Sequence, residues 1–132
     1  MKFLICLLSV LAIASATTFT FDGLMKCESK GIWCFTIRAM EYDLISNDEI
    51  AKYKKCNGPN MLLDKMPTEY KMSGSQDNDG LLDNYFEVGF EVTHNCTGTE
   101  QYIYTDYVEV PVKEGVFSMS KNFDLNANDV MP

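Results

Sequence analysis

The stretch that decides the fold of this chain is YFEVGFEVTHNCT, residues 85–97. From Phe86 to Val92, apolar side chains at every second position alternate with polar or small ones. A period of two is the pattern of a β-strand that buries one face and exposes the other. The strand leads into Asn95-Cys96-Thr97, an acceptor sequence for N-glycosylation that must be solvent-exposed to be used. This segment therefore predicts a β core, an oxidising compartment and a strand end that faces water.

The N-terminus predicts secretion. Lys2 precedes an apolar run over residues 3–14, and small residues follow it. This arrangement is typical of a signal peptide cleaved after Ala16, and the run is too short to span a bilayer as a helix. A retained N-terminal anchor is the alternative. We expect residues 1–16 to be a signal peptide and residues 17–132 to form one secreted, extracellular domain.

The charge balance limits the class of partner. Removing Lys2 from the 11 basic residues leaves 10 against 19 acidic residues, a net charge of −9 for the mature chain. The basic residues gather only at Lys52-Tyr53-Lys54-Lys55. Nucleic acid and anionic membrane surfaces would repel such a domain, so we expect neither as a partner.

Four cysteines remain after the signal peptide, namely Cys27, Cys34, Cys56 and Cys96. An even number in a short secreted chain predicts two disulfides, and the spacing leaves all three connectivities open. A zinc site is the rival interpretation. The chain has no Cys-x-x-Cys pair and a single histidine, so we expect no metal and no other cofactor.

Further segments show alternating or β-branched and aromatic patterns typical of strands: residues 18–26, 33–42, 69–72, 102–112, 116–119 and 122–125. Residues 46–55 are the one place where a helical turn is compatible with the sequence, because Ser46 and Glu49 have capping-box spacing. A surface turn is the alternative there. The polar tail over residues 126–132 is expected to fray. Several short strands with little helix predict an all-β sandwich.

Motifs along the mature chain follow the order found in a known family. They are Leu24-Met25-Lys26-Cys27, residues 37–43, residues 70–75, residues 90–96, Val110-Pro111 and Asn122-Phe123-Asp124-Leu125. In this order the chain resembles the nematode transthyretin-like family of secreted proteins. Residues 46–67 depart from that family, as do the positions of Cys34 and Cys56.

The resemblance implies a transthyretin-like antiparallel β-sandwich of about seven to eight strands in two sheets. Because Cys34 and Cys56 are atypical of the family, it also implies that they pair with each other and leave Cys27 to pair with Cys96. The family suggests an extracellular role at cell surfaces or in secretions, with a protein or a lipid headgroup as the partner. We expect a monomer.

Two activities associated with this fold are not supported by the residues. Hydroxyisourate hydrolases use several histidines, an arginine and a C-terminal Tyr-Arg-Gly-Ser, whereas this chain has only His94 and ends in Val130-Met131-Pro132. A lone histidine cannot supply an acid–base relay, so we predict a structural role for His94 at a strand end. Hormone transport depends on final strands that pair edge to edge in a tetramer, and residues 126–129 are poor strand formers.

Three tyrosines are the candidates for recognition. Tyr102 and Tyr104 are predicted to share one strand face, and Tyr107 the other. Tyrosine combines apolar area with a hydroxyl group, which suits binding, but tyrosines are also common as cross-strand packing pairs, and packing is the favoured interpretation. We therefore predict a secreted, non-enzymatic binding protein glycosylated at Asn95. A carrier of a small hydrophobic ligand and a hydroxyisourate-hydrolase-like enzyme are the alternatives, and calcium binding by Asp77, Asp79 and Asp83 is a weaker one.

Overall fold

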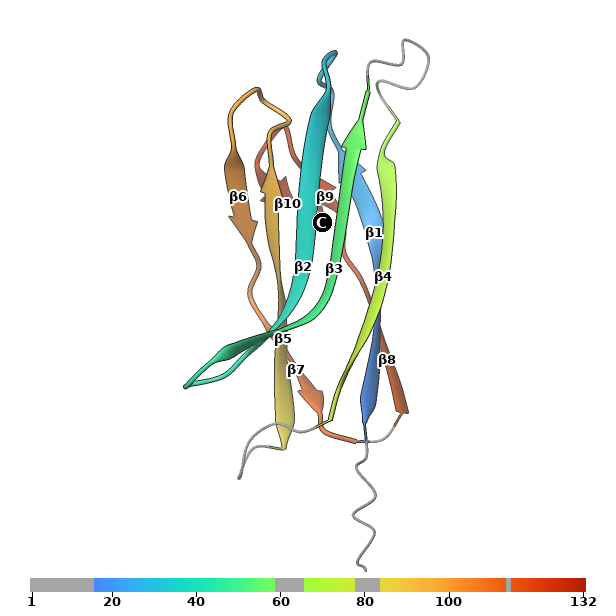
Figure 1. Ribbon diagram of the computed structural model, residues 1–132, viewed down its shortest axis with the longest axis vertical. Coiled ribbons are helices and arrows are strands. Elements are labelled where there is room, and N and C mark those ends of the chain that lie inside the picture. Colours follow the sequence, from blue (N-terminus) through green and yellow to red (C-terminus); the bar gives the residue numbers. More distant parts are fainter. Residues whose placement is uncertain (1–15, 59–65, 78–83, 114) are drawn as a thin grey trace, which may run out of the picture.

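The computed structural model describes residues 16–58, 66–77, 84–113 and 115–132. These residues form ten β-strands, and the fold is all-β as the alternating patterns predict. The strands make up two sheets that face each other as a sandwich (Figure 1). Within the described part of the chain, no helix is long and apolar enough to cross a membrane.

Sheet A is built around the first strand. It contains β1 (Thr17–Lys26), β4 (Thr68–Gln76), β8 (Gly115–Ser120), β9 (Phe123–Asp124) and β10 (Asp129–Val130). β4 pairs with β1 antiparallel, whereas β8 and β9 follow one another along β1 and run parallel to it. β10 then returns antiparallel to β9. The last strand therefore lies near the C-terminal end of β1, because β9 pairs with Met25 and Lys26.

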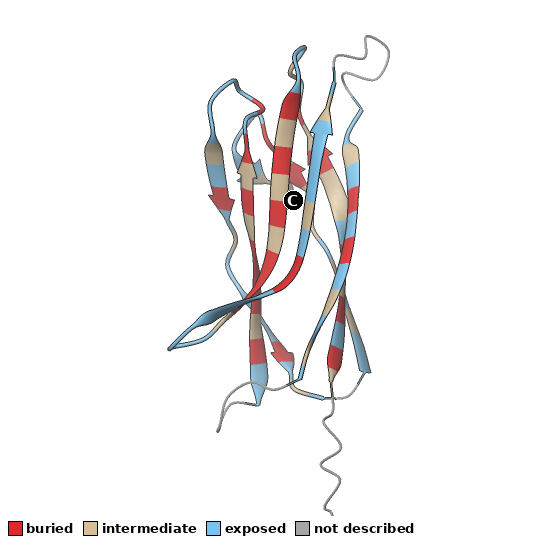
Figure 2. Ribbon diagram, in the orientation of Figure 1, coloured by how far each residue is buried: buried red, intermediate tan, exposed pale blue. Residues whose placement is uncertain are grey.

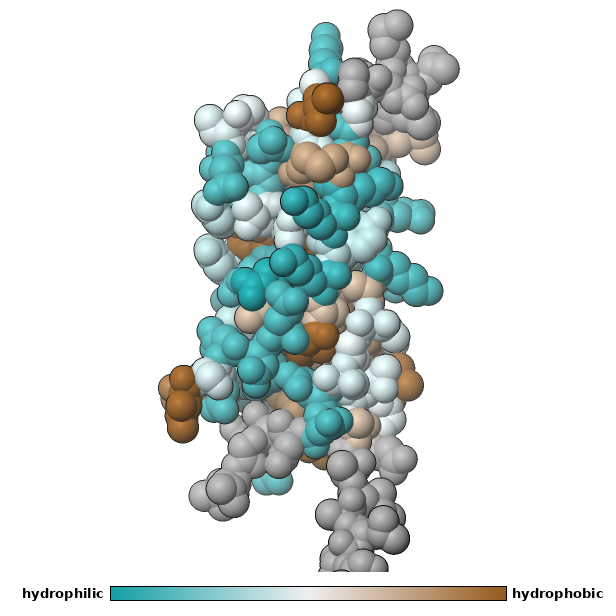
Figure 3. Space-filling view, viewed as in Figure 1, coloured by the Kyte–Doolittle hydropathy of each residue, from teal (hydrophilic) through white to brown (hydrophobic). Residues whose placement is uncertain are grey.

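Sheet B is antiparallel throughout. It contains β2 (Trp33–Tyr42), β3 (Asn47–Asn57), β5 (Tyr85–His94), β6 (Gln101–Tyr104) and β7 (Val108–Pro111). The order is β3-β2-β5-β6, and β7 pairs with the other end of β5. The hairpin that joins β2 to β3 projects beyond the sandwich (Figure 1). Leu44 and Ile45 at its tip are fully exposed, and a hydrophobic patch projects there in Figure 3.

The core lies between the inner faces of the two sheets. On β5, the alternating apolar residues that define the predicted strand are all buried (Figure 2). Phe19 on β1 packs edge to face on Phe86 of β5 with ring centroids 5.4 Å apart, and Phe21 packs likewise on Phe90 at 5.4 Å. Each buried Phe contributes roughly 2–3 kcal/mol of transfer free energy, and an edge-to-face pair adds about 0.5–1.5 kcal/mol.

A glycine allows the close approach of chain segments in sheet A. At Gly23 the backbone carbonyl oxygen of Lys121 lies only 1.8 Å from the position that a Cβ atom would occupy. Lys121 also donates its N–H to the carbonyl of Asp22 at 3.0 Å. The absence of a side chain at Gly23 therefore lets the segment between β8 and β9 dock directly on β1.

The prediction for residues 46–55 was wrong, because this segment forms neither a helical turn nor a surface turn. Most of it belongs to β3, which pairs with β2 over ten residue pairs, with a register shift between Ala39 and Met40. Ile50 and Ala51 are buried. Long-range pairing with β2 and burial of these two side chains outweigh the local capping signal, which gives only a weak preference for helix.

Two predictions near the C-terminus also need correction. The tail does not fray, because Asp129 and Val130 form β10 and the Met131 N–H donates to the carbonyl of Asn122 at 2.9 Å. Residues 102–112 are not one strand. They divide into β6 and β7, which pair with opposite ends of β5, and Thr105 between them binds both backbone polar groups of Phe90.

Candidate functional site

The outer face of sheet B carries an ion-pair network at its centre. Arg38 on β2 donates to Glu49 of β3 at 2.7 Å and to Glu91 of β5 at 3.1 Å. The hydrogen bond to Glu49 raises the pKa of Arg38 above its usual value. On the same face, burial raises the pKa of Tyr42, and the adjacent Glu91 carboxylate raises it further. Exposed ion pairs contribute little stability, so the network mainly fixes the positions of side chains that solvent can reach.

The predicted recognition tyrosines lie at the β6 edge of this face. Tyr104 is opposite Glu91 and Tyr102 is opposite Thr93, so the structure places both on the outer face as the sequence predicts. Their exposed fractions are 67% for Tyr104 and 49% for Tyr102. The Tyr102 hydroxyl donates to the carboxylate of Glu100, and this hydrogen bond raises the pKa of Tyr102.

Tyr107 does not lie on a strand face. It is in the loop between β6 and β7 and is 52% exposed. We name Tyr102, Tyr104 and Tyr107 together the tyrosine edge. Figure 3 shows that hydrophilic residues cover most of the side of the molecule in view. Tyr102 and Tyr104 each expose part of the ring on β6, and Tyr107 exposes part of its ring in the loop that follows. Each ring is therefore partly packed against the protein and partly open to solvent.

His94 is buried in the position that the sequence predicts for a structural residue. It is 2% exposed, its Nδ1 accepts the N–H of Cys96 at 3.3 Å, and its Nε2 lies 2.9 Å from Oδ1 of Asn128. Because Nδ1 is an acceptor, the ring proton resides on Nε2 and is donated to Asn128. Both ring nitrogens are thus engaged, and His94 has no free nitrogen for a proton relay.

The two disulfides join Cys27 to Cys96 and Cys34 to Cys56, the pairing that the family resemblance implies. Cys27–Cys96 connects the end of β1 in sheet A to the end of β5 in sheet B, and both cysteines are buried. Cys34–Cys56 lies within sheet B. Two disulfides are compatible with an extracellular protein.

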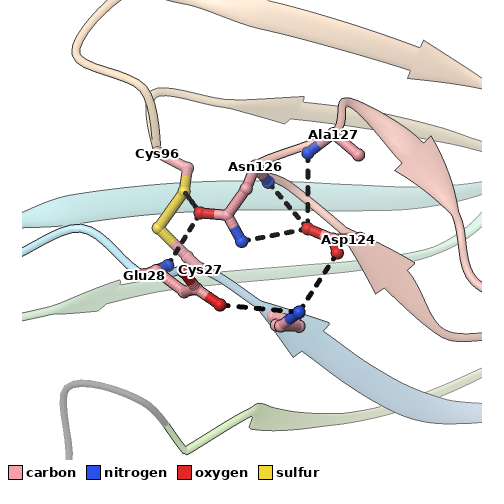
Figure 4. Close-up of polar contacts among 7 residues, drawn as sticks. Cys27, Glu28, Cys96, Asp124, Asn126 and Ala127 are labelled. Carbon is pink, nitrogen blue, oxygen red and sulfur yellow. Dashed lines mark hydrogen bonds and ion pairs between the residues drawn. A yellow bond between two sulfur atoms is a disulfide. The ribbon is translucent and has the colours of Figure 1, made fainter.

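The tail is held at the buried disulfide by Asn126, a residue that sequence reasoning missed. Its Oδ1 accepts the N–H of Glu28 at 2.9 Å and lies 3.5 Å from Sγ of Cys96 (Figure 4). Because Cys96 is in a disulfide, its sulfur carries no hydrogen and the contact is not a hydrogen bond. One side chain therefore bridges the segment after β1, the disulfide and the C-terminal tail.

Asp124 orients Asn126. Its Oδ1 accepts hydrogen bonds from the backbone N–H of Asn126 at 3.0 Å and from the side-chain Nδ2–H of the same residue at 2.9 Å. It also accepts the Ala127 N–H at 3.3 Å. Its Oδ2 lies 3.4 Å from Nζ of Lys26 (Figure 4). Burial alone would raise the pKa of Asp124, but the hydrogen bonds from Asn126, Ala127 and Lys26 outweigh it and hold the pKa below its usual value. We name Asp124, Asn126 and Cys27–Cys96 together the C-terminal clasp.

The glycosylation sequence is exposed as its use requires. Asn95 and Thr97 are both exposed. The Oδ1 of Asn95 accepts the N–H of Cys34 at 2.7 Å, and its backbone N–H donates to the carbonyl of Cys34 at 3.2 Å. These contacts orient the side chain and involve the oxygen rather than Nδ2, the atom to which a glycan is attached.

Clefts open on both sheets of the described surface. A cleft of about 570 Å³ runs over sheet A and is lined by residues that include Asp22 and Glu69, with Tyr53 of β3 at its side. A smaller cleft of about 160 Å³ lies on sheet B beside Cys34. No cluster of three or more metal-binding side chains occurs among the residues that the structure describes. Of the calcium candidates, Asp79 and Asp83 lie outside those residues.

Comparisons with known proteins place the chain in a family. The model of the family described as Caenorhabditis elegans protein of unknown function (DUF870) matches residues 22–129. The chain belongs to this family. It is also 31% identical over 115 residues to the uncharacterized protein B0416.7 of Caenorhabditis elegans, an alignment that covers 84% of this chain and 83% of the relative. No solved structure matches.

Proposed function

We propose that this chain is a secreted, non-enzymatic binding protein with a transthyretin-like sandwich, and that it binds an extracellular protein through the tyrosine edge. The apolar N-terminal run, the two disulfides and the exposed glycosylation sequence support secretion. The two-layer arrangement, in which most strand pairs are antiparallel, supports the resemblance to transthyretin-like proteins.

The observation that carries the binding proposal is the exposure of the tyrosine edge. Tyr104 alone is 67% exposed although it lies on a regular strand beside Glu91. Tyrosine and arginine are among the residues that most often dominate binding energy. Arg38 lies in the same cross-strand row as Tyr104, two strands away across Glu91, and is fixed by its two carboxylates. The face is therefore pre-organised, which reduces the entropy cost of binding.

A protein partner is favoured over a lipid headgroup by charge. The chain has a net charge of −8, so anionic headgroups would repel it. The burial of His94 supports the non-enzymatic part of the proposal, because the single histidine is 2% exposed with both ring nitrogens engaged.

Binding can be tested with the glycosylated domain, residues 17–132, immobilised against extracellular proteins and against vesicles of neutral and anionic lipid. We expect the wild type to capture a protein partner and the Tyr102→Ser/Tyr104→Ser variant to bind it at least about tenfold more weakly. The matched control is Val116→Ser, which changes a residue 71% exposed on sheet A. Equal binding by all three proteins, or binding to vesicles alone, would contradict the proposal.

One observation favours the carrier alternative, namely the cleft of about 570 Å³ over sheet A. Tyr53, Leu24 and Tyr70 contribute to its lining together with charged residues, so a ligand there would need both apolar and polar groups. Native mass spectrometry of protein from its natural source distinguishes the two functions. A bound small molecule that is lost in a Leu24→Asp variant would support the carrier, and a clean apo mass would count against it.

A further inference from the structure

The Cys34–Cys56 disulfide lies on the surface of the molecule. The two cysteines are directly opposite each other on β2 and β3, with Cα atoms 4.0 Å apart. Cys56 is exposed and Cys34 is half-buried, and β3 is the edge strand of sheet B. A dissolved thiol can therefore reach this bond, whereas Cys27 and Cys96 are only 3% and 4% exposed.

The basic cluster of the sequence is at the same place. Lys54 precedes Cys56 by two residues on β3, so their side chains share the outer face of the sheet at a spacing of about 7 Å. Lys55 adjoins Cys56 in the chain, and both lysines are exposed. In a chain of net charge −8, a surface disulfide thus has the chain's principal concentration of positive charge beside it.

A small cleft adjoins the bond. It has a volume of about 160 Å³, and its lining includes Cys34, Lys54, Asn95 and Glu100. Lys54 and Glu100 are the charged residues of this lining, and Lys55 adds a second positive charge outside it. The cleft lies on the Cys34 side of the bond, so it gives the Cys34 sulfur access to solvent. Lys54 shares the outer face with Cys56 and is near enough to attract carboxylates of an incoming thiol, whereas Lys55, opposite the buried Phe35, contributes its charge from the other face of β3.

We propose that Cys34–Cys56 is a site of thiol–disulfide exchange that accepts small anionic thiols. The thiolate of the incoming molecule attacks Sγ of the more exposed Cys56, a new sulfur–sulfur bond forms there, and Cys34 leaves as a thiolate. A second molecule of the thiol then attacks the mixed disulfide. In this second step Cys56 departs as a thiolate, and the two small thiols become joined to each other as a disulfide. The two thiols thereby supply the two electrons that reduce Cys34–Cys56.

The lysines favour both the approach of the anionic thiol and the departure of the cysteine thiolate. Positive charge attracts an anionic thiol to the bond, and it also stabilises the thiolate that leaves, which speeds exchange because a leaving thiol of lower pKa departs faster. The reaction need not unfold the domain. β2 and β3 remain paired over ten residue pairs, and the core and the buried Cys27–Cys96 bond are not involved. This proposal is independent of the binding function of the tyrosine edge.

The first test is differential alkylation of the folded, glycosylated domain during a titration with reduced glutathione, followed by peptide mapping. We expect Cys34 and Cys56 to become alkylated at least about ten times faster than Cys27 and Cys96, because rates of exchange depend on access. The far-ultraviolet circular dichroism spectrum should remain that of the oxidised protein. Simultaneous reduction of the two disulfides, or earlier reduction of Cys27–Cys96, would overturn the proposal.

The second test isolates the role of charge. The rate at which glutathione reduces Cys34–Cys56 is divided by the rate at which cysteamine, a cationic thiol, reduces it. This ratio is measured for the wild type and for Lys54→Glu/Lys55→Glu. The control, Lys71→Glu/Lys113→Glu, makes the same change of net charge at two other exposed positions. We expect the ratio to fall at least about threefold in the first variant at low salt, and to change less in the control. Equal ratios in the first variant and the wild type would overturn the preference for anionic thiols.

Discussion

The two disulfides of this sandwich have opposite surroundings. Cys27–Cys96 closes 69 residues, connects the two sheets and is the buried part of the C-terminal clasp. Cys34–Cys56 closes 22 residues, connects neighbouring strands of one sheet and lies at the surface. The comparison shows that a crosslink between layers becomes part of the core, whereas a crosslink along a strand ladder duplicates what the backbone hydrogen bonds already do.

The largest effect is expected from removing the buried disulfide. In the chain-entropy model, closing 69 residues is worth about 4 kcal/mol, and truncating the buried sulfurs leaves a cavity that adds to the loss. We expect Cys27→Ala/Cys96→Ala to lose at least about 4 kcal/mol of unfolding free energy, measured by urea denaturation. If this variant lost less unfolding free energy than the variant without Cys34–Cys56, the buried disulfide would not be the more stabilising of the two.

Removing the surface disulfide should lower the free energy of unfolding by less than removing the buried one. A loop of 22 residues corresponds to about 3.4 kcal/mol in the same model, and no fully buried side chain is lost. We predict that Cys34→Ser/Cys56→Ser remains folded and loses at most about 3.4 kcal/mol in the same titration. A variant that fails to fold under conditions in which Cys27→Ala/Cys96→Ala still folds would show that the crosslink on the strand ladder is the essential one.

The clasp can be weakened without touching a cysteine. Asn126→Ala leaves the Glu28 N–H without its side-chain acceptor and removes one of several donors to the Asp124 carboxylate. Because both hydrogen bonds are exposed, we expect a loss of about 0.5–1.5 kcal/mol in unfolding free energy. Asn47→Ala, at an exposed position of β3, is the control and should change stability by less than about 0.5 kcal/mol. Equal effects of the two changes would mean that the clasp does not stabilise the fold.

The smallest effect is the pH dependence due to Asp124. Its pKa is lower in the folded protein than in the unfolded chain, so its contribution is fully present above the unfolded value of about 4 and is lost as the pH falls through the folded value. The difference in unfolding free energy between wild type and Asp124→Asn should therefore shrink as the pH is lowered from about 6 to 2. A difference that is constant over this range would exclude the role assigned to the carboxylate.

Much of the fold follows from period-two patterns. The predicted strand over residues 33–42 coincides with β2, and the alternation from Phe86 to Val92 lies within β5 (Tyr85–His94), because each has apolar side chains at every second position that a strand can bury on one face. β3 could not be predicted in this way. Its inward face mixes Ile50, Ala51 and Tyr53 with charged residues, and its strand character comes from pairing with β2.

The candidate sites show the same division. The exposure of Tyr102 and Tyr104 follows from alternation along a strand, and it could be predicted. The clasp could not, because Asp124 and Asn126 contact Lys26 and Glu28, which are 98 positions away in the chain, as well as each other. A polar tail has the composition of a frayed end, and only the tertiary structure shows that Asn126 binds the Glu28 N–H and that Asn128 binds the buried imidazole of His94.

The most direct test of this account is hydrogen–deuterium exchange after selective reduction and alkylation of Cys34–Cys56. The account predicts that increased exchange is confined to β3 and the adjoining end of β2, while the amides of Phe86, Val88 and Phe90 in the core strand β5 keep their protection. A general loss of protection across both sheets would contradict it, because the surface crosslink would then be holding the sandwich together.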